Sequence, residues 1–245
     1  MTSTTSKRSK SKPKSTKRAP SPPTPFNIKY SNIRGLRTNF TDVESLLHST
    51  KPSVLCLCET NLDSSISERD FDVPGYSTLI TKHDHLRRHM HGLGIYIKTG
   101  TPCARVPSFE DPDQPYICLR VALIHVTSYI FFLYRPQDDN LAVINSIAAK
   151  KDLILCDNPS ATFHICGDFN VHHEEWLTFS NKTTAEGIDC QNFALAHDLT
   201  QVVTFPTRIP DVESHFSSLL DLFLTNSHDL SEVSFNPPLG TSLCG

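Results

Sequence analysis

Two short apolar runs constrain the fold of this chain more than any other feature. The run Val54–Cys58 is apolar throughout, and residues 162–166 (TFHIC), which are mostly apolar, form a second segment of the same length. Short runs of this kind are typical of strands that are buried on both faces. The chain therefore needs a sheet that is covered on each side, which favours a layered α/β fold.

The other elements follow from the spacing of apolar residues. Helical spacing predicts helices at residues 39–48, 141–155 and 189–197. Alternation or short apolar runs predict further strands at residues 26–33, 92–98, 116–126, 128–134, 202–203 and 219–224. Several consecutive strands are too close in sequence for a helix between them, so the sheets must be partly antiparallel. A layered α/β fold with mixed sheets fits better than a TIM barrel or a Rossmann domain.

Charge divides the chain into a basic tail and an acidic body. Residues 1–25 hold seven of the 23 Lys and Arg residues and no acid, which leaves 16 basic against 26 acidic residues in the body. With almost nothing apolar to bury, the tail is expected to be disordered, and residues 26–245 are expected to form one domain. The tail is interpreted either as a nuclear-localisation or nucleic-acid-binding arm or as a solvated segment without a role.

The acidic body narrows the chemistry that the domain can use. Plain electrostatic DNA binding requires a basic surface, whereas a divalent cation reverses the local charge of a carboxylate site. No window approaches 18 consecutive apolar residues, and the N-terminus lacks the apolar run of a secretory signal. We therefore expect no membrane span and a nuclear or cytoplasmic protein.

The strongest local signal is the segment 167–172 (GDFNVH), which directly follows a predicted buried strand. Gly167 allows the backbone to turn. Asp168 and Asn170 are two residues apart and so lie on the same side of an extended chain. One can accept a proton while the other orients a phosphoryl oxygen. The alternative interpretation is a simple Asx-turn after a strand.

Further polar residues end other predicted strands. Glu59 follows Val54–Cys58, and Asn32 lies where the first predicted strand ends. The hard carboxylate oxygens of Glu59 suit Mg²⁺, which takes only one or two carboxylates and keeps several waters; the alternative interpretation of Glu59 is an ordinary loop acid. Tyr134 closes the predicted strand 128–134, and Asp221 lies within the apolar run 219–224, where a carboxylate is costly without a partner.

These residues form an ordered set that resembles a known superfamily. The order Asn32, Glu59, Tyr134, GDFN and Asp221 resembles the endonuclease/exonuclease/phosphatase superfamily. The segments 31–37 (SNIRGLR), 134–136 (YRP) and 167–172 look more narrowly like the apurinic-type endonuclease domain of non-LTR (LINE) retrotransposons of the jockey or CR1 kind. The resemblance covers roughly residues 27 to 242.

The resemblance implies a four-layered α/β sandwich with two mixed β-sheets and a nuclease that nicks DNA with Mg²⁺ or Mn²⁺. Carried over by position, Asn32 and Glu59 would lie at the metal. Asp168 would orient or deprotonate the attacking water. The alternatives are a truncated remnant without turnover, or a phosphatase or ribonuclease of the same fold.

Three more roles are implied by the same resemblance. Tyr134 would contact the scissile phosphate, and Asn170 would position it. Asp221 would pair with a histidine and hold its tautomer, which is a usual task of a buried carboxylate.

The chain departs from the resembled pattern at its end. The family continues Gly-Thr/Ser-Ser-Asp-His, whereas Gly240-Thr241-Ser242 is followed here by Leu243. We therefore expect a domain without its final Asp-His segment and with slow turnover, because one positioned acid–base group contributes about 10²–10⁴-fold to a rate.

Two further features have alternative interpretations. The histidine-rich stretch 83–91 is interpreted as a surface loop, with zinc or copper binding as the weaker alternative; the resemblance implies contact with the substrate there. Trp176 is expected to pack on the domain, although it could stack on a base.

Overall fold

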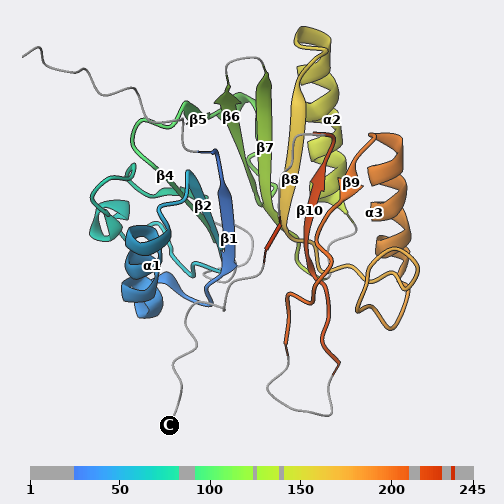
Figure 1. Cartoon of the computed structure of the whole chain (residues 1–245), viewed down its shortest axis with the longest axis horizontal. Coiled ribbons are helices and arrows are strands. Elements are labelled where there is room, and N and C mark those ends of the chain that lie inside the picture. Colours follow the sequence, from blue (N-terminus) through green and yellow to red (C-terminus); the bar gives the residue numbers. More distant parts are fainter. Residues whose placement is uncertain are drawn as a thin grey trace, which may run out of the picture.

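A computed structural model describes residues 25–82, 92–123, 126–137, 141–209, 216–227 and 233–234 (Figure 1). The predictions made for residues 1–24, for the histidine-rich stretch 83–91 and for the C-terminal segment 240–245 lie outside these ranges. Within them, no helix is long and apolar enough to cross a membrane.

Two mixed sheets form the centre of the domain. The first sheet has the order β1 (Ile28–Asn32), β2 (Val54–Cys58), β4 (Leu93–Ile97) and β3 (Ile80–Lys82). The second has the order β5 (Cys103–Arg105), β6 (Tyr116–Ala122), β7 (Thr127–Tyr134), β8 (Thr162–Asp168), β10 (Asp221–Thr225) and β9 (Thr200–Gln201). The pairs β1–β2 and β7–β8 are parallel, and the other pairs are antiparallel. The prediction of mixed sheets is confirmed.

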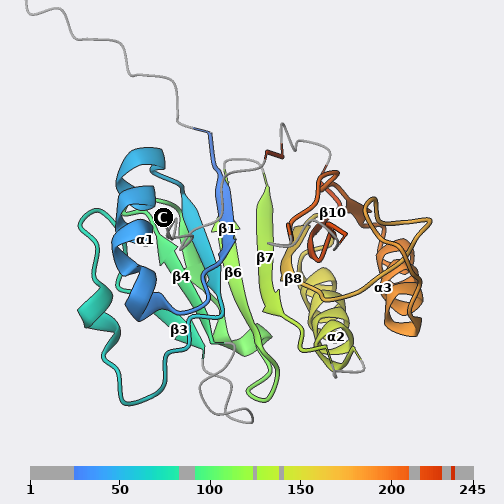
Figure 2. The same cartoon turned by 90° about the horizontal axis from the view of Figure 1, so that it is seen from below.

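Helices cover the outer face of each sheet, so the domain has four layers (Figures 1 and 2). Helix α1 (Leu36–Thr50) covers the first sheet, while α2 (Ala142–Asp157) and α3 (Ala185–Ala196) cover the second. Two short 3₁₀ helices, η1 (Glu68–Phe71) and η2 (Pro107–Phe109), lie in the connections. The expected four-layered sandwich is confirmed.

Strand β2 shows why the fold needs a cover on both sides. Cys56 and Cys58 face the second sheet, while Leu55 and Leu57 pack with residues of α1. All five residues of β2 are fully buried. Burying one Leu side chain is worth about 1.5–3 kcal/mol relative to leaving it exposed, so both faces contribute to stability.

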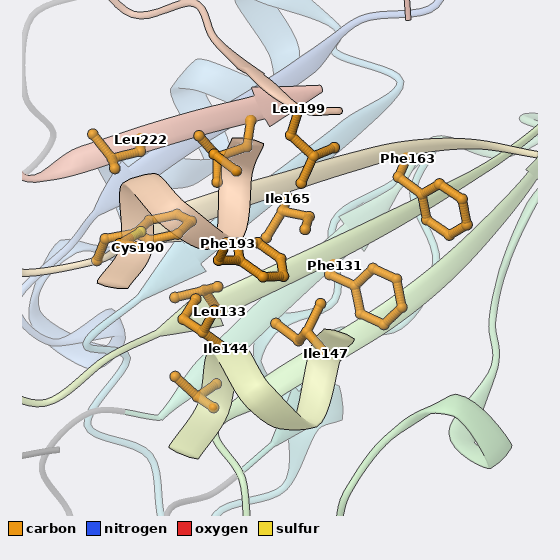
Figure 3. Packing of buried hydrophobic residues seen from close by; sticks show 14 of the residues in the cluster. Phe131, Leu133, Ile144, Ile147, Phe163, Ile165, Cys190, Phe193, Leu199 and Leu222 are labelled. Atoms are coloured by element: carbon orange, nitrogen blue, oxygen red, sulfur yellow. The ribbon is translucent and has the colours of Figure 1, made fainter. Parts of the chain in front are cut away.

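The outer face of the second sheet holds the largest of the apolar clusters. Phe131 and Leu133 of β7 and Phe163 and Ile165 of β8 lie against side chains of α2 and α3 (Figure 3). The facing helix residues are Ile144, Ile147, Cys190 and Phe193. This packing makes β7 and β8 rigid central strands, and both end at the candidate site.

One predicted strand is wrong. Residues 202–203 are not a strand, and β9 is the preceding pair Thr200–Gln201. The Gln201 side chain accepts from the Val203 amide at 2.7 Å and donates to the Val203 carbonyl at 2.7 Å. Because both backbone groups of Val203 bind this side chain, the β-ladder stops there.

Other boundaries shift, and two strands had no sequence signal. The edge strands β3 and β5 are three residues each, and none of their residues is fully buried, so they lack an apolar run. Strand β6 ends at Ala122 rather than at residue 126. Helix α3 begins at Ala185, before the predicted start, because the Thr184 hydroxyl caps it by accepting from the Gly187 amide at 3.2 Å.

Candidate active site

Polar side chains from five strands converge on one edge of the space between the sheets. Asn32, Tyr134 and Asp168 are the last residues of β1, β7 and β8, and Glu59 directly follows β2. Asp221 is the first residue of β10, but β10 runs antiparallel to β8, so it lies at the same edge. This edge is the lower one in Figure 1. The structure thus brings together all the sequence-predicted site positions.

Three of these residues form a row across the second sheet. Asp168 is the register partner of Tyr134 on β7 and of Asp221 on β10. Register partners point to the same face of a sheet, and here that face is the one that meets the first sheet. Asp168 and Tyr134 are each 6% exposed. A buried carboxyl group, Asp168, and a half-buried one, Asp221, therefore lie on adjacent strands.

A hydrogen bond from the first sheet reaches this row. The Tyr30 hydroxyl of β1 donates to Asp221 Oδ1 at 2.6 Å. Tyr30 was not among the site residues predicted from the sequence. The sequence did contain one indication of its position. Side chains alternate between the two faces of a strand, so Tyr30, two residues before Asn32, lies on the same face as Asn32.

Asp168 and Asn170 form a tight loop at the end of β8. The Asn170 amide donates to Asp168 Oδ1 at 3.0 Å, and Asn170 has a left-handed backbone with φ 48°. The Asx-turn considered for this segment is therefore present, together with the placement of Asp168 beside Asp221. The two interpretations are compatible, because the turn uses one carboxylate oxygen only.

Arg135 supports this loop. The sequence prediction included it only within the motif 134–136 and gave it no role of its own. Arg135 is 1% exposed, and its Nη1 donates to the carbonyls of Phe169 at 3.2 Å and Asn170 at 3.1 Å. Its own amide donates to the Asp168 carbonyl at 2.8 Å. The Asn170 side-chain Nδ2 donates back to the Arg135 carbonyl at 2.9 Å. Each residue of the loop is thus bonded to Arg135.

The two metal-candidate residues lie together on the first sheet. Asn32 is the register partner of Cys58, and Glu59 is the next residue along β2. The Gly35 amide donates to the Glu59 carbonyl at 2.7 Å, and the Arg34 amide donates to Asn32 Oδ1 at 3.2 Å. Glu59 and Arg34 both have left-handed backbones, with φ 53° and 51°. Such strain costs about 1–3 kcal/mol per residue and clusters at functional sites.

The electrostatics of the site favour a bound cation. Burial raises the pKa of Asp168 well above its usual range, and the charges of Asp221 and Glu59 raise it further. Burial also raises the pKa of Asp221 to about 6, although the hydroxyls of Tyr30 and Thr207 oppose the rise. Three acids therefore repel one another in a poorly solvated place, and a divalent cation would relieve this repulsion.

The donor set fits magnesium better than zinc. Across the part of the chain that the structure describes, no three His, Cys, Asp or Glu side chains are grouped as ligands of one ion. Mg²⁺ needs only one or two carboxylates and completes its shell with water and substrate oxygens. Glu59 with Asn32 satisfies that requirement.

The raised pKa of Asp221 predicts a pH dependence of stability without metal. A folded-state pKa of about 6 against an ordinary value of 3.8 means that the folded state holds the proton more tightly. The contribution of Asp221 to the free energy of unfolding is therefore fully present below about pH 4 and is lost as the pH rises through 6, by roughly 2–3 kcal/mol. Asp168 should extend the loss to higher pH.

Urea unfolding in EDTA at pH 4 and pH 8 measures this effect. Asp221→Asn cannot ionise at that position, so its stability should fall less between the two pH values than that of the wild type. Asp152→Asn, which changes a largely exposed acid on α2, should behave as the wild type does. An unchanged loss in Asp221→Asn would contradict the prediction.

Trp176 is half-buried and packs against the large apolar cluster, with its ring edge-on to His173 at 6.3 Å between centroids. The packing interpretation of Trp176 is confirmed.

Comparisons with known proteins agree with this architecture. A family model described as the endonuclease/exonuclease/phosphatase family matches residues 30–240. A search of curated proteins finds no match.

Three solved structures illustrate the similarity. The endonuclease domain of TRAS1, a telomere-specific non-LTR retrotransposon, has a TM-score of 0.60 and 12% identity over 82% of this chain and 84% of that one. The AP endonuclease LMAP of Leishmania major has a TM-score of 0.67 and 16% identity over 82% and 79%. The 3′ phosphatase NExo of Neisseria, bound to a product DNA hairpin, has a TM-score of 0.59 and 17% identity over 82% and 86%. At these identities the likeness establishes the fold.

Proposed function

The chain belongs to the endonuclease/exonuclease/phosphatase family, and from this premise we propose that it is a Mg²⁺-dependent DNA endonuclease that hydrolyses one phosphodiester bond to leave a nick. One observation carries the proposal: Asp168 and Asp221 lie side by side on adjacent strands, within electrostatic reach of Glu59. This arrangement combines a basic carboxylate with a place for a divalent cation.

The metal end of the site would be Glu59 and Asn32. A bound Mg²⁺ or Mn²⁺ would neutralise charge on the phosphoryl oxygens. The left-handed backbone at Glu59 aims the residue away from the strand ladder, and the Gly35 amide holds its carbonyl. The backbone of Glu59 is thus held before any metal binds.

Asp168 would take the proton of the attacking water. Its raised pKa makes it a stronger base than an exposed aspartate. The water oxygen forms a bond to phosphorus, the P–O3′ bond breaks, and the leaving O3′ takes a proton from solvent, so the product is a 3′-hydroxyl beside a 5′-phosphate.

Asn170 and Tyr134 would hold the phosphate in line. An amide nitrogen carries two hydrogens. One hydrogen of Asn170 Nδ2 goes to the Arg135 carbonyl, and the side chain also bonds to the Asp168 carboxylate, so a bound phosphoryl oxygen would accept the hydrogen that now faces Asp168. Tyr134 lies next to Asp168 in register and would contact the same phosphate.

The narrower proposal is a domain of retrotransposon origin that acts on DNA. It is supported by the similarity to the TRAS1 endonuclease domain and by the motifs 31–37, 134–136 and 167–172. Its nick would supply a 3′-hydroxyl for priming by a reverse transcriptase. The basic residues 1–25 would then act as an arm for DNA or for nuclear import.

Relaxation of supercoiled plasmid tests the proposal. The chain is expected to convert supercoiled DNA to open circle in Mg²⁺ or Mn²⁺, slowly and at high protein concentration, and not in EDTA. Extension of the nick by a DNA polymerase without prior phosphatase treatment should show the 3′-hydroxyl.

Two other outcomes separate the alternatives. Release of phosphate from a 3′-phosphorylated DNA end, or cleavage of RNA alone, would favour a phosphatase or ribonuclease of the same fold. A folded chain that processes none of these substrates in any metal would favour the non-catalytic remnant.

A further inference from the structure

Arg135 is a buried cation to which the proposed reaction gives no role. It directly follows Tyr134, the last residue of β7, and is 1% exposed. Taking a guanidinium group out of water is costly, and a buried charge is tolerated only where hydrogen bonds compensate for the lost water. The hydrogen bonds of Arg135 therefore show which part of the fold this side chain stabilises.

The backbone and the guanidinium group of Arg135 hold one short turn together. The Arg135 amide donates to the Asp168 carbonyl at 2.8 Å. Its Nη1 donates to the carbonyls of Phe169 at 3.2 Å and Asn170 at 3.1 Å. These three carbonyls belong to consecutive residues, so a single arginine fixes the backbone of the whole turn 168–170.

The turn places Asn170 in a conformation that residues other than glycine seldom adopt. Its φ is 48°, in the left-handed region, and such a conformation persists only where the surrounding structure determines it. The Asn170 carbonyl is one of the two that Nη1 binds. The guanidinium group therefore stabilises this conformation directly.

Arg135 also fixes the side chain of Asn170. Asn170 Nδ2 donates to the Arg135 carbonyl at 2.9 Å, and the same side chain bonds to the Asp168 carboxylate. Because an amide nitrogen carries two hydrogens, one is held by Arg135 and the other faces Asp168. Rotation of the amide would break the bond to Arg135, so this bond decides where the second hydrogen points.

A carboxylate on α3 lies within electrostatic reach of the guanidinium group. Glu186 is in the first turn of α3, and its pKa is lowered by its own backbone amide, by the Thr184 hydroxyl and by the charge of Arg135. Helix α3 packs on the outer face of the second sheet. Arg135 thus connects the turn 168–170 with a rigid part of the domain.

We infer that Arg135 is a positioning residue, an inference that rests on the proposed function: it holds the turn 168–170 so that one Asn170 hydrogen is directed to the phosphate beside Asp168. Arg135 touches neither water nor phosphate in this role and acts through Asn170. The planar guanidinium group offers several donors in a fixed geometry, whereas the ammonium of lysine is a compact point charge on a flexible stem. Lysine should therefore not replace it.

Arg135→Lys keeps the charge and removes the guanidinium group. In Mg²⁺-dependent nicking it should lower kcat about 10- to 100-fold, the scale expected when a positioning group is displaced by about 1 Å. KM should change little, because contacts to the DNA backbone elsewhere dominate binding. In an Asn170→Ala background, Arg135→Lys should have no further effect on kcat, since it acts through that side chain.

Lys151→Met is the matched control, because Lys151 is also a buried cation next to the second sheet. It is 4% exposed, and its Nζ lies 4.9 Å from the centroid of the Phe163 ring. Phe163 is near the start of β8, at the opposite end of the strand from Asp168. Lys151→Met should therefore retain kcat even if it lowers stability.

The side-chain amide of Asn170 reports the positioning without turnover. In NMR spectra of the metal-free full chain, labelled with ¹⁵N at asparagine, Asn170→Asp identifies the signal by its loss. One of the two hydrogens should be protected from solvent exchange at least about 10-fold relative to those of Asn192, which is exposed on α3. Arg135→Lys should remove this protection, and Lys151→Met should not.

The outcomes are distinguishable. Two unprotected Asn170 hydrogens in the wild-type chain would overturn the inference without any variant, even if Arg135→Lys fails to fold. Protection that persists in Arg135→Lys, an equal fall of kcat in Lys151→Met, or additive effects of Arg135→Lys and Asn170→Ala would also overturn it. If the protection follows the prediction but no DNA is nicked, Arg135 does position Asn170 and the proposed nuclease function fails.

Discussion

Asp168→Asn is expected to lower the rate of metal-dependent nicking by about 10²–10⁴-fold, the usual contribution of a positioned general base. The amide is nearly the same size as the carboxyl group and can still accept the Asn170 amide hydrogen on its oxygen. It cannot accept a proton from water at neutral pH. The change therefore removes the chemistry and keeps the loop.

Plasmid relaxation with equal amounts of folded protein measures this loss. Asp152→Asn, on the largely exposed part of α2, removes the same charge far from the row of acids and should nick as the wild type does. In EDTA, Asp168→Asn should also unfold at a higher urea concentration than the wild type at pH 8, because it removes a buried charge and its repulsion with Asp221 and Glu59. A variant that nicks at the wild-type rate would exclude Asp168 as the base.

Gly167→Ala is expected to destabilise the domain by roughly 3 kcal/mol or more, at the upper end of what single substitutions do. Gly167 has φ +142°, and a Cβ atom there would lie 1.9 Å from the Leu133 carbonyl oxygen of the neighbouring strand. The obstacle is backbone in the central β7–β8 pair, so it cannot move without breaking the parallel ladder. The substitution should also displace Asp168, the next residue.

Gly100→Ala separates steric conflict from backbone strain. Gly100 has φ +84°, but nothing lies within 4 Å of an added Cβ. Only the left-handed conformation then costs energy, about 1 kcal/mol. Urea unfolding should therefore rank Gly167→Ala well below Gly100→Ala in stability. Equal losses at the two positions would show that strain alone, rather than the contact with Leu133, makes glycine necessary at Gly167.

The site illustrates how a catalytic arrangement opposes stability. Asp168 and Asp221 are register partners that both resist ionisation, so the folded chain is less stable at neutral pH than it would be with amides there. The apolar clusters on both faces of the second sheet stabilise the fold and offset this loss of stability. Burial, together with this repulsion, gives Asp168 the basicity that the proposed reaction requires.

The sequence by itself determined the layered fold and the strand-edge residues. A run such as Val54–Cys58 requires burial on both faces, and a polar residue that ends such a run must lie at an edge of the sheet. That is why Asn32, Glu59 and Asp168 could be identified from local pattern alone. These patterns are informative because the order of apolar and polar residues over a few positions determines which side chains are buried.

Only the tertiary structure decided which edges meet. The hydrogen bond of Tyr30 to Asp221 spans 191 residues, and a tyrosine in a half-buried strand looks the same with or without such a partner. The buried Arg135 side chain donates to the carbonyl groups of Phe169 and Asn170. Such backbone acceptors cannot be recognised from the pattern of side chains in a sequence. The strand expected at 202–203 failed for the same reason, since a side-chain bond from Gln201 replaced the ladder. Long-range hydrogen bonds depend on three-dimensional position, which the local spacing of apolar residues does not encode.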